Sequence, residues 1–461
     1  MLAALTMLLC TGCSEDDTES TGDYCSISSL SIGSLRRTVV KRTGHGTTYK
    51  SVSTIYTTGW AFTIDQVNNE IYNRDSLPTR CSRTTVLNIA YRGRSIVYRL
   101  HNAPAATAWT AWNSTDSLYI PEDGGIDLKV YGSDGSERTY NMKLNIHKME
   151  MGDWQWKDMT EELDMSTWSE ARIAAIGNDV LLYGKGASGW NAVHGNEENA
   201  WETLTLTGIT CDRMTSDMVN GSGCLFMTDA DGNVWKSEDG AEWSETGLTG
   251  VSRLVAASPN RLYAIKDGTL CSTALSGNTE WTEEHIDDKP ESVTTLDDLG
   301  SSTGLFYERQ NGLKKLLLIA TLKNPTKEDI TAMAWGKMWN ASGNEKQREW
   351  IYYTPSWATK FGLPAMSPLA VVNINESIMA FGGIVAQNED LGIQPLNLIY
   401  FSQDDGLSWR TDDLHYLPDE LWGKDCSWLS ATTDSEDCVW IVARVNDTEV
   451  YVVRGKQNSA D

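Results

Sequence analysis

Residues 399–409 read IYFSQDDGLSW, and this stretch decides the fold class. It contains the pattern S-x-D-x-G-x-x-W, the Asp box, at Ser402, Asp404, Gly406 and Trp409. In such a turn the aspartate accepts backbone N–H groups, the glycine adopts a positive φ, and the tryptophan packs over the hairpin. A version shorter by one residue occurs at Ser237, Asp239, Gly240 and Trp243. We interpret all eight residues as structural parts of β-hairpins, not as catalytic groups.

The two hairpins belong to a repeat that fills the C-terminal two thirds of the chain. Each unit begins with a strand of small and apolar residues, and the six units start at Glu170, Cys211, Val251, Ser292, Met366 and Cys426. A second and a third strand follow, then a turn and a Trp-bearing fourth strand. This repetition predicts a six-bladed β-propeller over residues 154–456.

The last unit lacks a fourth strand, whereas residues 154–163 (WQWKDMTEEL) form a strand-like segment without a unit of their own. We expect this segment to complete the sixth blade, because that closure joins the two ends of the ring and removes two open sheet edges.

Residues 24–148 alternate between apolar and polar positions over short stretches, and turn signals such as Gly132–Gly135 separate these stretches. About seven short strands in a domain of this length predict an immunoglobulin-like β-sandwich. The expected fold is therefore all-β, with an Ig-like β-sandwich followed by the propeller.

The first residues predict the compartment. Residues 1–13 (MLAALTMLLCTGC) form an apolar run that is too short to span a bilayer and reads as a signal peptide. Its end resembles a bacterial lipobox, which implies lipidation of Cys13. An acidic tether follows at residues 14–23, and its first residues, Ser14 to Asp17 (SEDD), resemble the export signal of Bacteroidetes surface lipoproteins. We expect an outer-membrane lipoprotein exposed at the cell surface; a plain secretion signal or a short buried segment is the alternative.

Charge and cysteines exclude several function classes. The formal net charge is −25, and residues 149–461 hold 23 Lys and Arg against 49 Asp and Glu. Nucleic acid is therefore not an expected partner, because phosphate contacts require basic residues. The pair Cys211 and Cys224 and the pair Cys426 and Cys438 have matching positions in two repeats. Two hypotheses remain open: a disulfide within each pair, or four free thiols. The only CxxC spacing, Cys10 to Cys13, lies in the predicted signal peptide, and the sequence has no HExxH, P-loop or dinucleotide motif, so we expect no metal and no cofactor.

Three repeats place an arginine at one aligned position, namely Arg172, Arg213 and Arg253. The innermost strands of a propeller line its channel, so these guanidinium groups would form an anion site for an acidic sugar. Alternatively, each arginine pairs with an acidic neighbour between blades. Trp339 and Trp357 lie in the longest insertion and are candidates for stacking on sugar rings; packing beneath a long loop is the alternative.

The whole pattern resembles a family of Bacteroidales lipoproteins with an N-terminal Ig-like domain and an Asp-box propeller. The segments that carry the resemblance are residues 71–78 (IYNRDSLP), the strand end at 144–147, and the hairpins. This resemblance implies no activity. The leading hypothesis is a non-enzymatic surface protein that binds a glycan or a protein. The alternatives are a sialidase-like hydrolase or lyase with its site at the channel mouth, and a scaffold subunit of an outer-membrane assembly.

Overall fold

The structure is a computed structural model, and it describes residues 25–148, 152–161, 163–197, 201–277, 280–340, 342–353, 361–375, 377–385, 392–411 and 414–458. The chain divides into two compact units, which are described separately: Met1–Val39 with Lys50–Glu150, and Val40–Tyr49 with Met151–Asp461. Regular structure is almost entirely β; the described helices are the short 3₁₀ turns η1 (Thr57–Gly59), η2 (Leu296–Asp298) and η3 (Glu345–Gln347). Among these residues, no helix has the length and apolarity needed to cross a membrane.

The N-terminal part contains three sheets. The first consists of β1 (Ser26–Ile32), β6 (Thr84–Arg92) and β9 (Ser117–Tyr119). The second has the order β4 (Phe62–Asp65), β5 (Glu70–Asn73), β11 (Glu137–Lys143), β10 (Ile126–Tyr131), β7 (Ser95–Leu100) and β8 (Thr110–Ala111). The third is the hairpin of β2 (Leu35–Arg42) and β3 (Thr48–Ile55).

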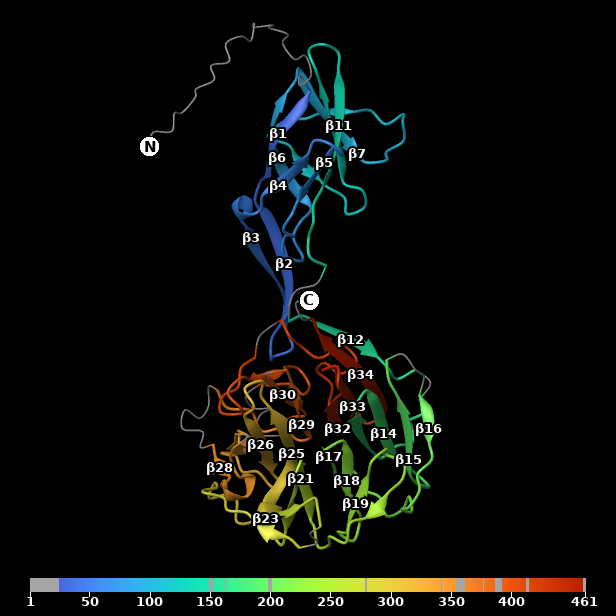
Figure 1. Cartoon of the computed structure of the whole chain (residues 1–461), viewed down its shortest axis with the longest axis vertical. Coiled ribbons are helices and arrows are strands. Elements are labelled where there is room, and N and C mark those ends of the chain that lie inside the picture. Colours follow the sequence, from blue (N-terminus) through green and yellow to red (C-terminus); the bar gives the residue numbers. More distant parts are fainter. Residues whose placement is uncertain are drawn as a thin grey trace, which may run out of the picture. The chain divides into compact units, whose positions relative to one another are not determined.

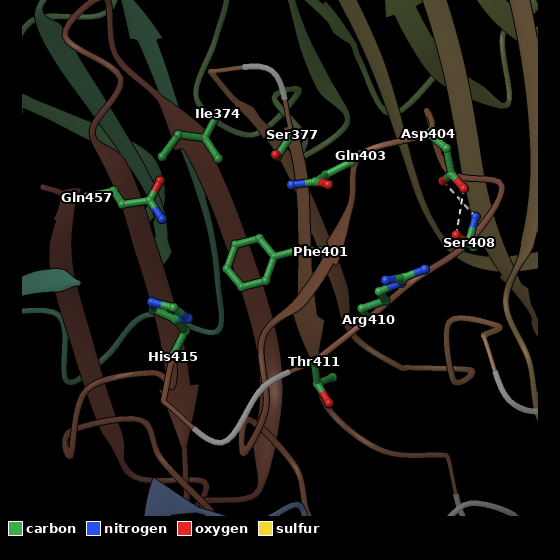
Figure 2. A pocket seen from close by; sticks show the side chains of 10 residues that line it. All are labelled: Ile374, Ser377, Phe401, Gln403, Asp404, Ser408, Arg410, Thr411, His415 and Gln457. Atoms are coloured by element: carbon green, nitrogen blue, oxygen red, sulfur yellow. Dashed lines mark hydrogen bonds between the residues drawn. The ribbon is translucent and has the colours of Figure 1, made fainter. Parts of the chain in front are cut away.

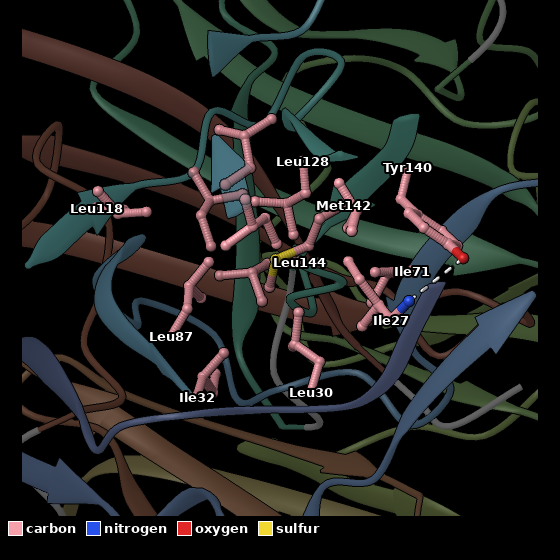
Figure 3. Close-up of a cluster of buried hydrophobic side chains, with 14 of the residues drawn as sticks. Ile27, Leu30, Ile32, Ile71, Leu87, Leu118, Leu128, Tyr140, Met142 and Leu144 are labelled. Atoms are coloured by element: carbon pink, nitrogen blue, oxygen red, sulfur yellow. Dashed lines mark hydrogen bonds between the residues drawn. The ribbon is translucent and has the colours of Figure 1, made fainter. Parts of the chain in front are cut away.

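One hydrophobic core joins the first two sheets. Ile27 and Leu30 of β1 and Leu87 of β6 share a cluster with Leu128 of β10 and Met142 of β11 (Figure 3). In β6 and β11 alternate residues point inward, as the period of two in the sequence predicts, whereas a β-bulge in β1 separates the inward-facing Ile27 and Leu30 by three positions. The N-terminal part is therefore a β domain built around one hydrophobic core.

The C-terminal part consists of six sheets of consecutive strands, which follow one another from green to red in Figure 1. Blades 1 to 3 are β13 (Glu170–Ile176), β14 (Asp179–Gly186), β15 (Gly189–Gly195) and β16 (Glu202–Leu204); β17 (Met218–Gly221), β18 (Cys224–Thr228), β19 (Val234–Ser237) and β20 (Ser244–Glu245); and β21 (Arg253–Ala257), β22 (Arg261–Lys266), β23 (Thr269–Ala274) and β24 (Thr282–Glu283). Blades 4 to 6 are β25 (Leu299–Glu308), β26 (Lys314–Leu322), β27 (Met333–Trp339) and β28 (Ile351–Tyr352); β29 (Leu369–Ile374), β30 (Ser377–Gly382) and β31 (Tyr400–Ser402); and β32 (Cys426–Thr433), β33 (Val439–Val445) and β34 (Glu449–Gln457) with β12 (Trp154–Asp158).

The first strands of the six blades contact one another in a closed circle, in the order β13, β17, β21, β25, β29, β32 and again β13. This circle makes the C-terminal part a β-propeller, with the first strands around its axis.

The sixth blade is completed from the other end of the propeller sequence. Strand β12 pairs antiparallel with β34, and Trp156 lies opposite Gly455. A Cβ atom on Gly455 would lie 2.3 Å from the Trp156 ring, so the glycine leaves the space in which this ring packs. The strand expected over residues 154–163 covers Trp154–Asp158.

The fourth blade differs from the expected strand assignment. The sequence pattern starts its first strand at Ser292, whereas η2 occupies Leu296–Asp298 and β25 begins at Leu299. Residues 304–309 (GLFYER) have the apolar pattern of a second strand, but residues 304–308 are the end of the first strand, β25. The physical reason is that Thr295 and Asp298 form a capping box around η2, which delays the strand by one turn.

Six cysteines of the described residues are free thiols: Cys25, Cys211, Cys224, Cys271, Cys426 and Cys438. Of the two alternatives for the matched pairs Cys211–Cys224 and Cys426–Cys438, the structure therefore has the free thiols. Burial raises the pKa of the Cys438 thiol to about 11, which disfavours the reactive thiolate.

Candidate functional site

The two Asp boxes have the geometry of structural turns. The Asp239 carboxylate accepts hydrogen bonds from the backbone N–H groups of Ala241 and Glu242, both at 2.9 Å. The Gly240 N–H donates to Ser237 Oγ at 2.8 Å, and Gly240 has φ +79°. Trp243 is buried beneath the turn. These contacts give Asp239 a structural role in the turn.

The second box repeats this arrangement. The Asp404 carboxylate accepts the Ser408 N–H at 2.8 Å, and the Gly406 N–H donates to Ser402 Oγ at 2.8 Å. Trp409 is buried and donates its indole N–H to the Gly406 carbonyl at 3.2 Å. The turn chemistry of the sequence motif is therefore present at all eight positions.

A cavity of about 640 Å³ opens at the channel mouth, and all six blades contribute to its wall. Eight hydroxyl side chains line it: Ser216, Ser252, Ser301, Ser302, Thr303, Ser367, Ser427 and Ser430. Its charged residues are Glu170, Arg172, Asp217 and Arg253, and Trp428 is its aromatic residue. The formal charges of the four groups cancel, so the cavity is polar without a net charge.

Arg172, Asp217 and Arg253 occupy the same position in blades 1, 2 and 3, just before the apolar residues of each inner strand. Each of them reaches the next blade. Arg172 Nη2 donates to the Met218 carbonyl at 2.7 Å, and Asp217 Oδ2 accepts the Leu254 N–H at 2.8 Å.

Arg253 continues this pattern, since its Nη1 donates to the Gly300 carbonyl at 2.8 Å and to Ser302 Oγ at 2.9 Å. These three side chains therefore hold neighbouring blades together as well as lining the cavity. Arg172 Nε is buried and has no hydrogen-bond partner in the described residues. Arg172 Nη2 and Arg253 Nη1, by contrast, already donate the hydrogen bonds between blades.

Burial raises the pKa of Asp217, although hydrogen bonds from Thr228 and Leu254 and the charges of Arg253 and Arg172 oppose this change. Burial also lowers the pKa of Arg172, and the Asp217 charge opposes it. Glu170, the second carboxylate of the cavity, accepts a short hydrogen bond from Ser216 Oγ. Sequence reasoning missed both carboxylates; the signal for Asp217 is its place directly before the apolar pair Met218 and Val219.

Arg213 is not at the channel mouth, so the expected triad of arginines is wrong at this position. Its Nη2 lies 2.5 Å from Asp229 Oδ2, and its guanidinium carbon lies 5.3 Å from the Trp235 ring centroid. The physical reason is that residues 211–217 form a loop, and the inner strand β17 begins only at Met218. The residue aligned with Arg172 and Arg253 is thus Asp217.

The tryptophan hypothesis fails at Trp339, because this side chain is 5% exposed and packs against Phe306 within the core of blade 4. Trp339 ends the third strand β27, whereas the sequence pattern placed it in a loop. Trp357 and Cys13 lie outside the described residues, and with them the signal peptide and the acidic tether.

Two family models match the chain. Residues 152–460 match the DUF6242 beta propeller domain, and residues 30–144 match the N-terminal domain of DUF6242, a domain of unknown function. The chain belongs to the DUF6242 family. No curated protein matches this DUF6242 chain.

Solved structures with a similar fold have low sequence identity to this DUF6242 protein. An auxiliary nutrient binding protein from Bacteroides thetaiotaomicron is 12% identical, covers 84% of this chain and 95% of its own, and has a TM-score of 0.44. A DUF4623 family protein from Bacteroides eggerthii is 9% identical, with coverages of 94% and 99% and a TM-score of 0.36. The six-bladed lectin of the fungus Aleuria aurantia is 12% identical, with coverages of 63% and 93% and a TM-score of 0.38.

Proposed function

We propose that this DUF6242 protein is a non-enzymatic, cell-surface glycan-binding protein, and that the channel mouth is its ligand site. The observation that carries the proposal is the wall of the cavity, to which every blade contributes hydroxyl or charged side chains. A volume of about 640 Å³ lies in the range of small-molecule sites. A wall rich in hydroxyl groups matches the hydroxyl groups of a sugar, since each can both donate and accept a hydrogen bond.

The balance of charge at the site favours a neutral sugar over an acidic one. Arg172 and Arg253 alone would attract an anion, but Asp217 lies in the aligned position between them and Glu170 lies at the same mouth. Both carboxylates repel an anionic ligand. The acidic ligand expected from three arginines therefore gives way to a neutral one.

The remaining parts of the proposal concern the surroundings of the propeller. Lipidation at Cys13 would anchor the chain in the outer membrane, the acidic tether would direct it to the cell surface, and an Ig-like N-terminal domain would act as a spacer. The support is the sequence of residues 1–23 together with the two-sheet core of the N-terminal domain.

A glycan array probed with the soluble chain from Ser14 onward tests the ligand class. We expect neutral glycans to bind to the native chain, and the Arg253→Ala variant to bind at least tenfold more weakly. Lys236→Ala is the control, because Lys236 is partly exposed in blade 2 and pairs with Glu238 away from the channel. A chain that binds no glycan would contradict the proposal and point to a protein ligand or a scaffold role.

A specific observation favours a glycan-active enzyme as the second candidate. Glu170 and Asp217 line one cavity, and the raised pKa of Asp217 is a property of a general acid. Release of reducing sugar from any bound glycan, lost in both Asp217→Asn and Glu170→Gln, would establish turnover. If a glycan binds at the same affinity over hours of incubation and no reducing sugar is released, only the binding function remains.

A further inference from the structure

A second cavity lies between blades 5 and 6, away from the channel mouth. It measures about 600 Å³, and Figure 2 shows its ten lining side chains. Phe401 lies in the middle of the view, with His415 and Gln457 to one side and Arg410 and Asp404 to the other. None of its lining residues belongs to the wall of the channel cavity. We call it the blade 5–6 pocket.

The Asp box of blade 5 determines which side chains face this pocket. Phe401 and Arg410 exchange both backbone hydrogen bonds, at 2.8 and 2.9 Å, so they form a directly opposed antiparallel pair. Side chains of such a pair lie on the same face of the sheet. Trp409, which directly precedes Arg410, points to the other face and packs in the core shared with Leu317 of blade 4. The box thus places Phe401 and Arg410 on the same face of blade 5, and the Arg410 guanidinium carbon lies 5.9 Å from the Phe361 ring centroid.

The opposite wall comes from the end of β34 and the loop before blade 6. The His415 ring meets the Phe401 ring edge to face, with centroids 6.1 Å apart and planes at 82°. Gln457 Nε2 donates to the Gly152 carbonyl at 3.1 Å, which orients the Gln457 amide. Phe401 is itself half-buried against the core of blades 5 and 6, so its position is held by packing.

Both hydrogen-bond donors and hydrogen-bond acceptors surround Phe401. Asp404 is an acceptor, and its pKa is lowered because hydrogen bonds from Ser408 and Ser402 outweigh the effect of burial. Arg410 is an exposed donor, and Gln403 and Thr411 offer both donors and acceptors. Asp404 and Arg410 have opposite charges, so the described groups create no preference for a charged ligand.

The equivalent position beside the Asp box of blade 2, between blades 2 and 3, can be compared with the blade 5–6 pocket. A cavity of about 640 Å³ lies there beside the other Asp box, and its lining includes Lys236 and Ser244. Lys236 and Ser244 are directly paired across their hairpin, as Phe401 and Arg410 are in blade 5, so Lys236 corresponds to Phe401 and Ser244 to Arg410. The fold thus produces a cavity beside both Asp boxes, but only the one beside blade 5 combines an aromatic ring with a guanidinium group at these positions.

We propose that the blade 5–6 pocket is a second carbohydrate site, which binds a neutral pyranose against Phe401. The C–H-rich face of the sugar ring packs on the phenyl ring, whose burial supplies the apolar contact. Adjacent hydroxyl groups donate to Asp404 and accept from Arg410, whose planar fork can contact two oxygens at once. This site is independent of the channel mouth and does not rest on the function proposed there.

Saturation-transfer NMR and calorimetry on the chain from Ser14 onward test this proposal. The probes are the methyl pyranosides of glucose, galactose, mannose and L-fucose, with methyl glucuronoside as the acidic comparison. The measurements are made on the Arg253→Ala chain, whose channel mouth is altered, so that the binding reports on the blade 5–6 pocket. We expect at least one neutral probe to bind to this chain, and both Phe401→Leu and Arg410→Ala, added to it, to weaken that binding at least tenfold. Phe401→Leu keeps an apolar side chain in the core, and an unchanged melting temperature excludes unfolding as the cause.

Two controls separate this site from the others. Lys236→Ala alters the matched position beside the first Asp box, and Arg253→Ala alters the channel mouth; both should leave pyranoside binding at the blade 5–6 pocket unchanged. The proposal is overturned if no neutral pyranoside binds at millimolar concentration. It is equally overturned if Phe401→Leu and Arg410→Ala, added to the Arg253→Ala chain, leave that binding unchanged, or if Arg253→Ala abolishes all binding.

Discussion

Asp229 accepts the indole N–H of Trp235 at 3.0 Å, and the same carboxylate accepts the backbone N–H groups of Asp231 and Asn233. In blade 6, Asp434 holds Trp440 in the same way at 2.8 Å. Each aspartate lies six residues before its tryptophan, in the turn that precedes a strand of the blade. One carboxylate thus shapes the turn and orients a large core side chain at the same time.

Replacement of Asp229 by Asn should destabilise the propeller in a pH-dependent way. Burial would raise the pKa of Asp229, but hydrogen bonds from Asn233 and Trp235 outweigh burial and hold it at about 2, below the ordinary value of 3.8. The stabilisation is therefore complete above pH 4 and is lost as the pH falls through 2. A shift of this size corresponds to about 2 kcal/mol at neutral pH.

Urea unfolding followed by tryptophan fluorescence measures this effect. The difference between the native chain and Asp229→Asn should be large at pH 7 and shrink toward pH 2. Asp231→Asn is the matched control, because its carboxylate is 78% exposed in the same turn. A difference that stays constant from pH 7 to pH 2 would disprove the assigned role of the charge.

Replacement of Gly455 by Ala should weaken the closure of the ring. The added methyl group would lie 2.3 Å from the Trp156 ring, and such overpacking costs about 1–3 kcal/mol. Thermal unfolding should show a lower midpoint for Gly455→Ala. Adding Trp156→Leu should recover part of this loss, because the smaller side chain makes room. Gly59→Ala is the control, since no atom lies within 4 Å of its added methyl group; equal losses at both glycines would argue against the clash.

Replacement of Asp405 by Asn should loosen the contact between blades 4 and 5. Asp405 accepts hydrogen bonds from the Tyr307 hydroxyl at 2.8 Å and from Arg309 Nε at 3.1 Å, and it pairs with the buried Lys315. Asn keeps the shape and tolerates the φ of +64°, but it removes the negative charge that contacts Lys315 and Arg309. We expect a loss of about 3 kcal/mol in the free energy of unfolding.

The comparison for this variant is Glu238→Ala, which removes the partner of Lys236. That pair is solvent-exposed, with side-chain exposures of 35% and 78%, so its loss should cost less than about 1 kcal/mol. If both variants unfold at the same urea concentration, burial does not strengthen the Asp405 cluster.

Replacement of Asp217 by Asn should change the charge preference of the channel mouth. The variant removes a negative charge from the aligned position between Arg172 and Arg253, so an acidic sugar such as methyl glucuronoside should bind about fivefold more tightly, which corresponds to about 1 kcal/mol. Binding of neutral methyl pyranosides should stay the same. Calorimetry at pH 7 measures both affinities, and an equal change for acidic and neutral probes would contradict this electrostatic explanation.

The local patterns of the chain determined much of the architecture. Asp boxes predict hairpins because turn chemistry acts within a few residues, and the period of two in apolar positions predicts strands. The six strand groups and the pairing of Trp154–Asp158 with the last blade also follow from the repeat, since an incomplete unit at one end and an isolated strand at the other complement each other. At this level, the sequence by itself determined an N-terminal β domain and a C-terminal propeller.

The tertiary structure alone decided which side chains meet. The loop at residues 211–217 places Asp217, not Arg213, in the wall of the channel cavity, and the packing of Trp339 against Phe306 buries this tryptophan at the end of β27. Packing against neighbouring blades determines the residue at which a loop ends and a strand begins, so the sequence of a single repeat does not predict this residue. Likewise, the blade 5–6 pocket joins Phe401 to Gln457, residues far apart in the sequence that the packing of blade 6 against blade 5 brings together.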